Sequence, residues 1–397
     1  IFKILRLFMI KKISNKPENS SLIDEKTNSY GSESLTPEKK LVSYSELAVL
    51  GTFEASMKKA NKKTIISFCE GLLGGFFISL AYIAAIFVSQ AVQQTGLKIM
   101  LMGAVFPIAI LLITFVGGSL YTSNCVGFLN VRLKNVKAKP FIKNLFVVYA
   151  GNFIGTLVAS FILLMMGFLV PFYGSETIDH GAFGEASTQF YMKKIWTIGT
   201  TLQWDVLKHE NITLFNEYVA QNGTPKTTVT FGMFAYVFFA NLFSGIFCNI
   251  LIASTLYLTY STKSATACCL LLCFDILAFV IGGFQHSVAN AFLFWMDVFQ
   301  GSSGFKEAYQ ISNLSSYFSS NPDTISINPL SIGYFIGANL IPCFIGNFIG
   351  GGVILPFTLY LIFKDQIKKL SKELLIKYSS EKIEKIKDDI AISLKND

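Results

Sequence analysis

Apolar residues gather in six long runs that are separated by shorter polar segments. Each run reaches the roughly 18 residues at which an apolar stretch is long enough to span a bilayer as a helix. Charged residues make up 15% of the chain, against about 25% in soluble domains, and hydrophobic residues make up 52%. The pattern predicts an all-α polytopic membrane protein with six transmembrane helices, at residues 65–90, 99–121, 144–171, 230–260, 266–283 and 329–363.

Two of the six runs break before they end. The second ends in "GGSLYTSNCVGF" (Gly117–Phe128) and the fifth in "GGFQHSVANAFLF" (Gly282–Phe294). In both, paired glycines precede hydroxyl, amide or imidazole side chains, and apolar residues then resume. Such sequence is tolerated at membrane depth only where it is buried in protein or lines a cavity. We therefore expect broken second and fifth helices that meet near the centre of the membrane.

The pentapeptide GNFIG occurs twice, at Gly151–Gly155 in the third run and at Gly346–Gly350 in the sixth. Its recurrence divides the chain into two units of three spans. A unit with an odd number of spans re-enters the membrane from the opposite side, so we expect an inverted 3+3 repeat. Asn152 and Asn347 should then form hydrogen bonds across helices. The alternative is a chance recurrence among a small set of residue types.

The remaining segments suggest three regions. Residues 1–48 are polar and rich in Ser, Lys and Glu, which is typical of a disordered tail. The stretch "YSELAVLGTFEASMKKANKK" reads as an amphipathic helix at the membrane surface. Residues 49–363 form the predicted transmembrane domain, with an outer-loop insertion at 172–229, and residues 364–397 form a charged helix.

The charge distribution predicts the orientation of the chain. The net charge is +8, and most of the 33 Lys and Arg fall in segments that six spans would bring to one side of the membrane. Positive charge concentrates on the cytoplasmic side, so both termini of this multi-pass protein should lie in the cytoplasm, with the plasma membrane as its location. Basic tails near anionic membrane lipid account for the charge without a nucleic-acid partner.

No pattern in the sequence points to an enzyme. The seven cysteines have no metal-ligand spacing, and there is no disulfide framework. There is also no glycine-rich nucleotide-binding loop and no combination of nucleophile and base. We therefore expect a protein without a cofactor or a metal.

Four motifs, in this order, resemble formate/nitrite transporters: "LYTSNCVGF", "FCNILIASTLYLTYS", "GGFQHSVANAF" and "IGNFIGGGVILPF". The resemblance covers roughly residues 50–363. It implies an aquaporin-like fold and a homopentamer in which each protomer holds its own pore. It also implies transport of small monovalent anions such as formate, nitrite or lactate, usually with a proton.

The resemblance assigns roles to individual residues. Thr122 and His286 flank the pore centre, and Asn249 matches the family's asparagine of the fourth span. Ser123 and Asn290 lie beside them in the two broken segments. The resemblance implies two hydrophobic constrictions, a cytoplasmic one of Phe106, Leu120 and Tyr121 and an outer one of Ile110 and Phe279.

The family's pattern is not complete in this chain. Its anion-attracting lysine usually lies sixteen positions before the asparagine equivalent to Asn249, where this chain has Met233. Lys226 is the nearest substitute and becomes the candidate for anion attraction. Ser119 and Gln285 stand where the family usually has an acidic residue.

Several alternatives stay open at this point. His286 has a reference pKa of about 6.5, so it is a candidate proton relay, but buried in its neutral form it would be only a hydrogen-bond donor. The protein could also be a channel for water or neutral solutes with the same fold. A membrane scaffold that transports nothing is the third possibility.

Overall fold

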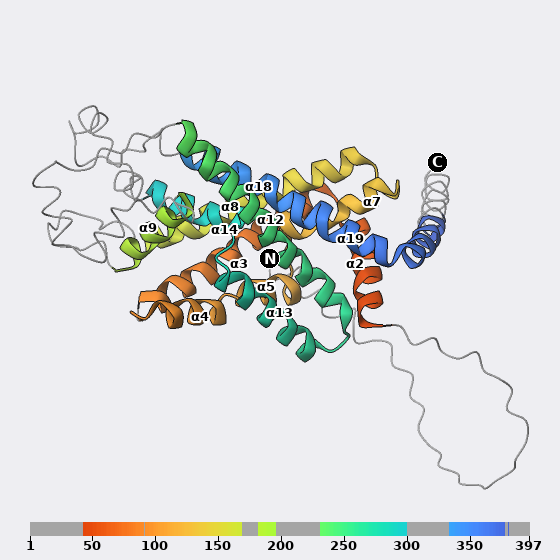
Figure 1. Ribbon diagram of the computed structural model, residues 1–397, viewed down its shortest axis with the longest axis horizontal. Coiled ribbons are helices and arrows are strands. Elements are labelled where there is room, and N and C mark those ends of the chain that lie inside the picture. The colour runs from red at the N-terminus through yellow and green to blue at the C-terminus, as the bar shows by residue number, and fades with distance from the viewer. Residues whose placement is uncertain are drawn as a thin grey trace, which may run out of the picture. The chain divides into compact units, whose positions relative to one another are not determined.

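In this computed structural model the described residues are 43–90, 92–168, 182–195, 231–299, 333–377 and 380. They all belong to one compact unit, Val42–Asp397. Their regular structure is entirely helical (Figure 1). Most of the predicted tail and most of the predicted outer insertion lie outside the described residues.

Among the described residues, five helices are long and apolar enough to cross a membrane. Two shorter apolar helices, of 17 and 13 residues, follow one another at and just after the predicted fifth span. The all-α membrane architecture is therefore confirmed. The first half consists of α3 (Thr64–Gln90), α4 (Thr95–Val105), α5 (Ile108–Phe115), α6 (Tyr121–Asn124), η1 (Cys125–Gly127), α7 (Phe128–Arg132) and α8 (Ala138–Met165).

The second half repeats this order of long, broken and long helices. Its last span, Gly333–Ile362, contains two π-helical stretches, where the backbone winds more loosely. The elements are α12 (Phe231–Ser261), α13 (Ala265–Ile281), α14 (Ser287–Phe299), η2 (Ile336–Leu340), α18 (Ile341–Phe348), η3 (Ile349–Ile354) and α19 (Leu355–Ile362).

Both predicted breaks are present. The helix α5 ends at Phe115 and α13 ends at Ile281, and a glycine with positive φ follows each: Gly117 at +118° and Gly283 at +63°. Glycine adopts these angles without the steric cost that a side chain adds. A further interruption, which the sequence did not predict, separates α4 from α5 at Pro107, which has no N–H to continue the helix.

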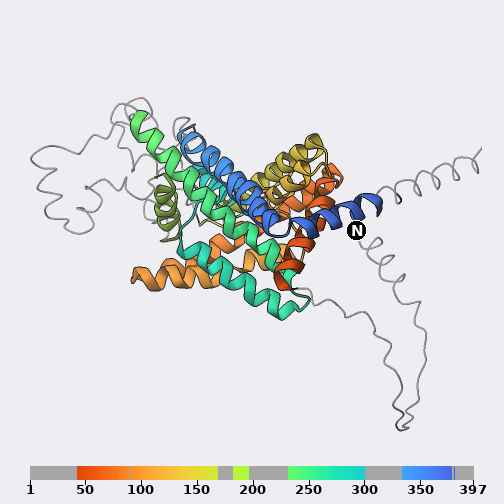
Figure 2. The ribbon, with the colours of Figure 1, turned by 45° about the vertical axis from the view of Figure 1, so that its right-hand side comes forward.

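Glycines bring the long helices of each half into close contact. A Cβ on Gly75 of α3 would overlap the backbone carbonyl of Asn152 in α8. In the same way, a Cβ on Gly346 of α18 would overlap the carbonyl of Leu242 in α12. The helices α12 and α18 run side by side in Figure 2. Small residues at such contacts let two membrane helices approach closely.

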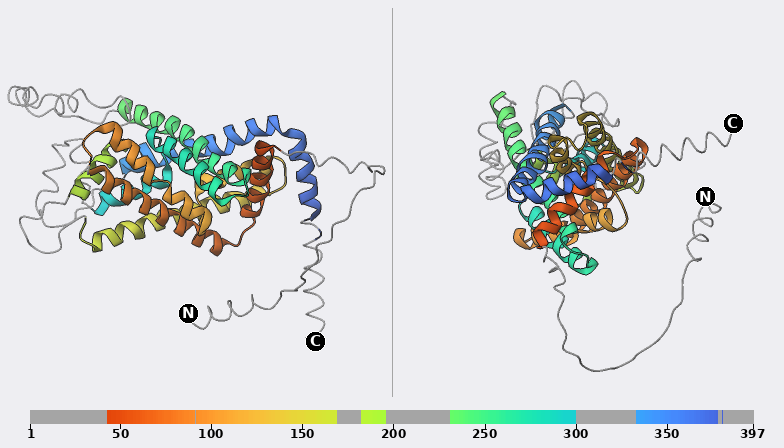
Figure 3. Two further views of the ribbon diagram at one scale, coloured as in Figure 1. Left: turned by 90° about the horizontal axis from the view of Figure 1, so that it is seen from below. Right: turned by 90° about the vertical axis from the view of Figure 1, so that its right-hand side faces the viewer.

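Two helices outside the spans lie at opposite ends of the helical bundle (Figure 3). The predicted surface helix is α2 (Tyr44–Ala60), and the Ser43 side chain accepts a hydrogen bond from the Glu46 N–H at its start. It shares an apolar cluster with the helix at 364–377, which contributes Ile367 and Leu374. That helix covers part of the predicted charged C-terminal region. At the other end lies α9 (Ala182–Ile195), inside the predicted insertion.

Candidate functional site

Asn152 holds the first broken helix against its neighbours. Its Nδ2 donates hydrogen bonds to the carbonyls of Gly71, at 2.7 Å, and Ser119, at 2.8 Å. Its Oδ1 accepts a bond of 2.9 Å from the backbone N–H of Tyr121, the first residue of α6. The side chain is fully buried. One amide thus satisfies two backbone groups that the break would otherwise leave unpaired, the Ser119 carbonyl and the Tyr121 N–H, and ties them to the Gly71 carbonyl of α3.

Asn347 does the same for the second broken helix. Its Nδ2 donates to the carbonyls of Gly245, at 2.8 Å, and Gln285, at 3.0 Å. Its Oδ1 accepts a bond of 3.0 Å from the N–H of Ser287, the first residue of α14. The predicted bonds across helices are therefore confirmed. The same three bonds in each half explain why GNFIG occurs twice, and they rule out a chance recurrence.

A second chain of bonds continues from the first break towards α2. The Ser119 hydroxyl donates to Asn124 Oδ1 at 3.1 Å, and Asn124 Nδ2 donates to Asn144 Oδ1 at 3.1 Å. Asn144 Nδ2 in turn donates to the backbone carbonyl of Lys59, at 3.2 Å. The polar residues of this loop are thereby tied to the end of α2.

The second half contains a matching chain that ends at α9. Asn290 Nδ2 donates to Gln285 Oε1 at 2.9 Å and to Asn339 Oδ1 at 2.8 Å. Asn339 Nδ2 donates to the carbonyl of Lys194, at 2.8 Å. Asn290, which the resemblance assigned to the pore, is fully buried within this chain of bonds.

The helix α9 therefore occupies in the second half the position that α2 occupies in the first. Each has the tripeptide Met-Lys-Lys just before its last residue, at Met57–Lys59 and Met192–Lys194. In each, the carbonyl of the second lysine accepts a bond from an asparagine eight residues before the asparagine of GNFIG. The repeat thus extends beyond the predicted three spans to four helices.

Thr122 and His286 meet where the two broken helices come together. Thr122 Oγ1 and His286 Nε2 are 3.1 Å apart, and both side chains are buried. The backbone N–H of Ala289 donates to His286 Nδ1 at 3.0 Å. This bond requires an unprotonated Nδ1, so the imidazole is neutral and its Nε2–H donates to Thr122.

Asn249 and Ser123 support this meeting point. Asn249 Nδ2 donates to the carbonyls of Thr122, at 3.0 Å, and Asn347, at 2.6 Å, which links α12 to both halves. The Ser123 hydroxyl donates to the Leu120 carbonyl at 3.0 Å. Both are buried and bonded to backbone, so they position the broken helices.

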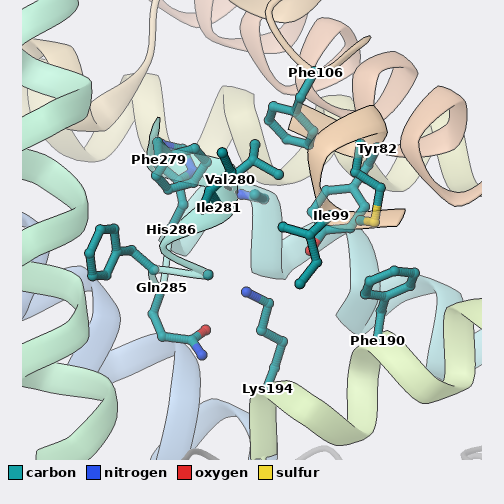
Figure 4. Close-up of a pocket in the computed structure, with 14 residues that line it drawn as sticks. Tyr82, Ile99, Phe106, Phe190, Lys194, Phe279, Val280, Ile281, Gln285 and His286 are labelled. Carbon is teal, nitrogen blue, oxygen red and sulfur yellow. Dashed lines mark hydrogen bonds between the residues drawn. The ribbon is translucent and has the colours of Figure 1, made fainter. Parts of the chain in front are cut away.

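A cavity of about 200 Å³ reaches His286 from the α9 end of the bundle. Figure 4 shows Lys194 of α9 extending its ammonium group into this cavity, on the same side as Gln285. The rest of the lining is mainly apolar. The cavity therefore combines one positive charge, one amide and one neutral imidazole within apolar walls: Tyr82, Ile99, Met102, Phe106, Phe190, Phe279, Val280, Ile281, Gly283, Phe284 and Ala289.

A second and much smaller cavity, of about 10 Å³, lies on the other side of two phenylalanines. Phe106 and Phe279 line both cavities, and their ring centroids are 6.2 Å apart. His286 also lines both. Ile110 and Leu120 line the small cavity and do not appear in the lining of the large one.

All four predicted residues Phe106, Ile110, Leu120 and Phe279 line the small cavity, and only Phe106 and Phe279 also line the large one. Phe106 and Ile110 are four residues apart in the α4–α5 span, which corresponds to about one helical turn or 6 Å. The two side chains therefore lie at different depths along the path. Tyr121 lines neither cavity, because its ring stacks on Phe344 at 4.0 Å and its hydroxyl donates to the Phe344 carbonyl.

Lys194 is not among the site residues predicted from the sequence. The predicted candidate, Lys226, lies outside the described residues, and Met233 lies within α12. The family spacing of sixteen positions before Asn249 does not lead to Lys194, because residues 196–230 separate α9 from α12. The repeated Met-Lys-Lys was the available signal. Within the described ranges, no three His, Cys, Asp or Glu side chains cluster as a metal site would require.

Two broken helices that meet at a buried polar pair, between cavities divided by apolar side chains, define a channel or transporter. The chain belongs to the formate/nitrite transporter family: the family profile, "Formate/nitrite transporter", matches residues 46–361. Members of this family carry small anions across membranes and are not enzymes.

Individual relatives agree with this assignment. The formate channel FocA of Haemophilus influenzae is 26% identical over 306 residues, which cover 76% of this chain and 89% of the relative. The uncharacterized transporter YrhG of Bacillus subtilis is 29% identical over 325 residues, covering 81% and 94%. The formate-nitrite transporter of Entamoeba histolytica is 23% identical over 307 residues, covering 77% and 66%.

Solved structures share the fold. A structure described as a pentameric formate channel with formate bound matches with a TM-score of 0.51 at 23% identity, and the match covers 76% of this chain and 97% of that one. A structure described as an FNT family ion channel matches with a TM-score of 0.55 at 18% identity, covering 79% and 98%.

Proposed function

We propose that this protein carries small monovalent anions, formate first and lactate or nitrite as further candidates, across the plasma membrane together with a proton. The observation that carries the proposal is the neutral His286–Thr122 pair, 3.1 Å apart, at the end of a cavity that contains Lys194. We further propose that the protein works as a homopentamer with one path in each protomer, by analogy with the relative described as a pentameric formate channel.

Lys194 attracts the anion in this proposal. It is the lysine of the larger cavity, and its charge is surrounded by apolar walls of low dielectric. A positive charge in such a cleft raises the local concentration of anions. The Gln285 amide adds a hydrogen-bond donor without a negative charge. Lys226 remains a predicted contributor.

The phenylalanine pair explains why a proton travels with the anion. A carboxylate that passes between Phe106 and Phe279 loses its hydration and gains no polar partner from these rings. Burial of an unpaired charge is far more costly than burial of a neutral polar group. The substrate therefore crosses this part of the path, and the Ile110–Leu120 region beyond it, as the neutral acid.

His286 acts as a fixed hydrogen-bond donor in this mechanism. Its Nδ1 already accepts the Ala289 N–H, so a proton on that nitrogen would break a buried hydrogen bond. Its Nε2–H donates to Thr122, which leaves the Thr122 hydroxyl hydrogen for another acceptor. We therefore propose that the substrate takes its proton from water in the larger cavity and not from His286.

The direction of the path follows from the charge distribution. If the basic segments face the cytoplasm, α2 lies on the cytoplasmic side and α9 on the outer side. The cavity with Lys194 then opens outwards, and Ile110 and Leu120 lie nearer the cytoplasm.

Uptake of labelled formate, lactate and nitrite into proteoliposomes, measured over a pH series, tests the function. We expect uptake that increases as the external pH falls. His286→Ala should abolish it, whereas His286→Gln, which keeps an N–H donor, should retain part of the activity and the same pH profile. A pH profile that is lost in His286→Gln would make His286 a proton relay.

The same assay separates the alternatives. A channel for water or neutral solutes would show solute flux that does not respond to pH. A scaffold would show no flux of any solute although the protein is folded and inserted.

A further inference from the structure

A third cavity, which is basic, lies at the α2 end of the bundle, away from the path described above. Its volume is about 450 Å³. It is formed where the α2–α3 turn meets the start of α8. Four of its lining residues are lysines, and the others are small or polar with few exceptions: Ala60, Asn61, Lys62, Thr64, Ser67, Lys137, Lys139, Pro140, Lys143, Asn144 and Val147.

The positive charge of this cavity is largely uncompensated. Lys62 forms an ion pair of 2.6 Å with Glu70. In the part of the chain that the structure describes, no carboxylate lies within ion-pair distance of Lys137, Lys139 or Lys143. Lys139 and Lys143 are four residues apart on α8 and so project from one face of the helix. Three lysines without an acidic partner in one cavity favour binding of an anionic ligand.

The backbone adds N–H donors, which carry a partial positive charge. The helices α3 and α8 both begin at this cavity, at Thr64 and Ala138. The first turn of a helix has unpaired N–H groups and the positive end of the helix dipole. The side chain of Lys137, at the cap of α8, bonds to none of these groups. Lysine ammonium groups together with helix N-termini bind phosphate oxygens well.

The surroundings distinguish a lipid from a free phosphate. Ile65 of α3 is 66% exposed and Phe146 of α8 is 59% exposed, and Ile142 is exposed beside them on α8. Each is the neighbour in sequence of a residue that lines the cavity. Since α3 and α8 are membrane-spanning helices, these apolar side chains continue from the cavity into the hydrocarbon region.

We propose that this basic cavity binds the phosphate-bearing headgroup of an anionic membrane lipid, whose acyl chains lie along Ile65, Ile142 and Phe146. The site is separate from the substrate path and does not depend on the proposed transport function. It is connected to that path through Asn144, which lines the cavity and bonds to Asn124 in the first broken helix.

Binding of soluble short-chain lipids to the purified full-length protein in a neutral detergent tests the site. The probes are dioctanoyl phosphatidylserine, dioctanoyl phosphatidylcholine and inorganic phosphate, titrated while thermophoresis of the labelled protein is recorded. We expect saturable binding of phosphatidylserine, with phosphatidylcholine and phosphate weaker by at least about tenfold. Phosphatidylcholine has no net charge to attract the lysines, and free phosphate has no acyl chains to bury against Ile65, Ile142 and Phe146.

The variant Lys139→Gln/Lys143→Gln should weaken phosphatidylserine binding by at least about tenfold. These lysines are exposed, so the fold is not at risk. The matched control is Lys368→Gln/Lys369→Gln, which removes the same charge from two exposed lysines of the 364–377 helix and should leave binding unchanged. Equal weakening in both variants would mean general attraction to a basic surface and would overturn the site. Binding of free phosphate as strong as that of the lipid would overturn the lipid as its occupant.

Discussion

The loop after α5 and the loop after α13 make the same backbone bonds and present different side chains. In each, the asparagine of GNFIG accepts from the first N–H of the following helix, at Tyr121 in one half and Ser287 in the other. The residue immediately before that N–H is Leu120 in the first half and His286 in the second. The scaffold is therefore symmetric, whereas the side chains at its centre are not.

A second pair of equivalent positions shows the same division. Gly75 and Asn249 each lie four residues after the glycine whose carbonyl binds the GNFIG asparagine. Gly75 only allows close packing against the Asn152 carbonyl. Asn249 donates to the Asn347 carbonyl and also crosses to the Thr122 carbonyl of the other half. The residues common to both halves thus form the scaffold of backbone bonds. The residues that differ, His286 and Asn249, connect the two halves and line or support the substrate path.

The largest expected effect comes from removing the hydrogen bonds of Asn347 or Asn152, which hold the two broken helices in place. Replacing Asn347 with Ala leaves two buried backbone groups of the break without partners, the Gln285 carbonyl and the Ser287 N–H, each at a cost of about 1–3 kcal/mol. We expect the apparent melting temperature in detergent to fall by many degrees, and Asn152→Ala should behave alike because its three bonds are the same. If either variant keeps the wild-type melting temperature, or if the two melting temperatures differ clearly, the two asparagines do not have equivalent roles.

The next effect concerns the unshared loop residues. His286→Leu makes the second loop resemble the first and removes the donor to Thr122, so formate uptake should fall about a hundredfold or more, as for loss of a critical hydrogen-bond donor. Leu120→Val, at the equivalent position, keeps an apolar wall and should change uptake by less than about threefold. Uptake is measured in proteoliposomes after insertion has been matched. Equal losses in the two variants would contradict the asymmetry.

Lys194→Gln should have a smaller effect that depends on substrate concentration. Removal of the attracting charge should reduce uptake at low formate about tenfold, with recovery near saturation, since local anion enrichment is what is lost. Added salt should reduce wild-type uptake and affect the variant little. Lys98→Gln on α4, outside the cavity lining, is the control with the same change of charge. A variant with an unchanged half-saturation concentration would remove Lys194 from the mechanism.

The smallest expected effect is at the apolar restriction. Phe106→Leu keeps the wall apolar and shortens it, so larger acids such as lactate should gain relative to formate by a few-fold, in line with the modest selectivity that hydrophobic pockets achieve. The ratio of lactate to formate uptake measures this. Ile113→Val, partly buried beside the same apolar core, serves as the control and should leave the ratio unchanged.

Much of the scaffold was predictable from the sequence, because its signals are local or repeated. Paired glycines before polar residues predicted both breaks, and GNFIG predicted the repeat and its cross-helix bonds. The features that the sequence did not predict depend on contacts between residues far apart in the chain. Lys194 was missed because residues 196–230 separate α9 from α12, and a fixed spacing from Asn249 has no meaning across that segment.

The depth of the constriction residues along the path could not be predicted from the sequence for a related reason. Family resemblance identified the relevant side chains, but their depth along the path depends on the unpredicted break at Pro107 and on packing between halves. Phe106 meets Phe279 only because α13 lies against α4. Tyr121 was drawn away from the path by stacking on Phe344, more than 200 residues later in the chain.

The central claim is that the substrate passes the phenylalanine pair uncharged, held by a neutral His286–Thr122 pair. The most direct test records formate uptake, internal pH and membrane current together in proteoliposomes clamped at several potentials. We predict one proton taken up with each formate and a rate that does not change with potential. Formate uptake that carries current and leaves the internal pH constant would contradict the claim.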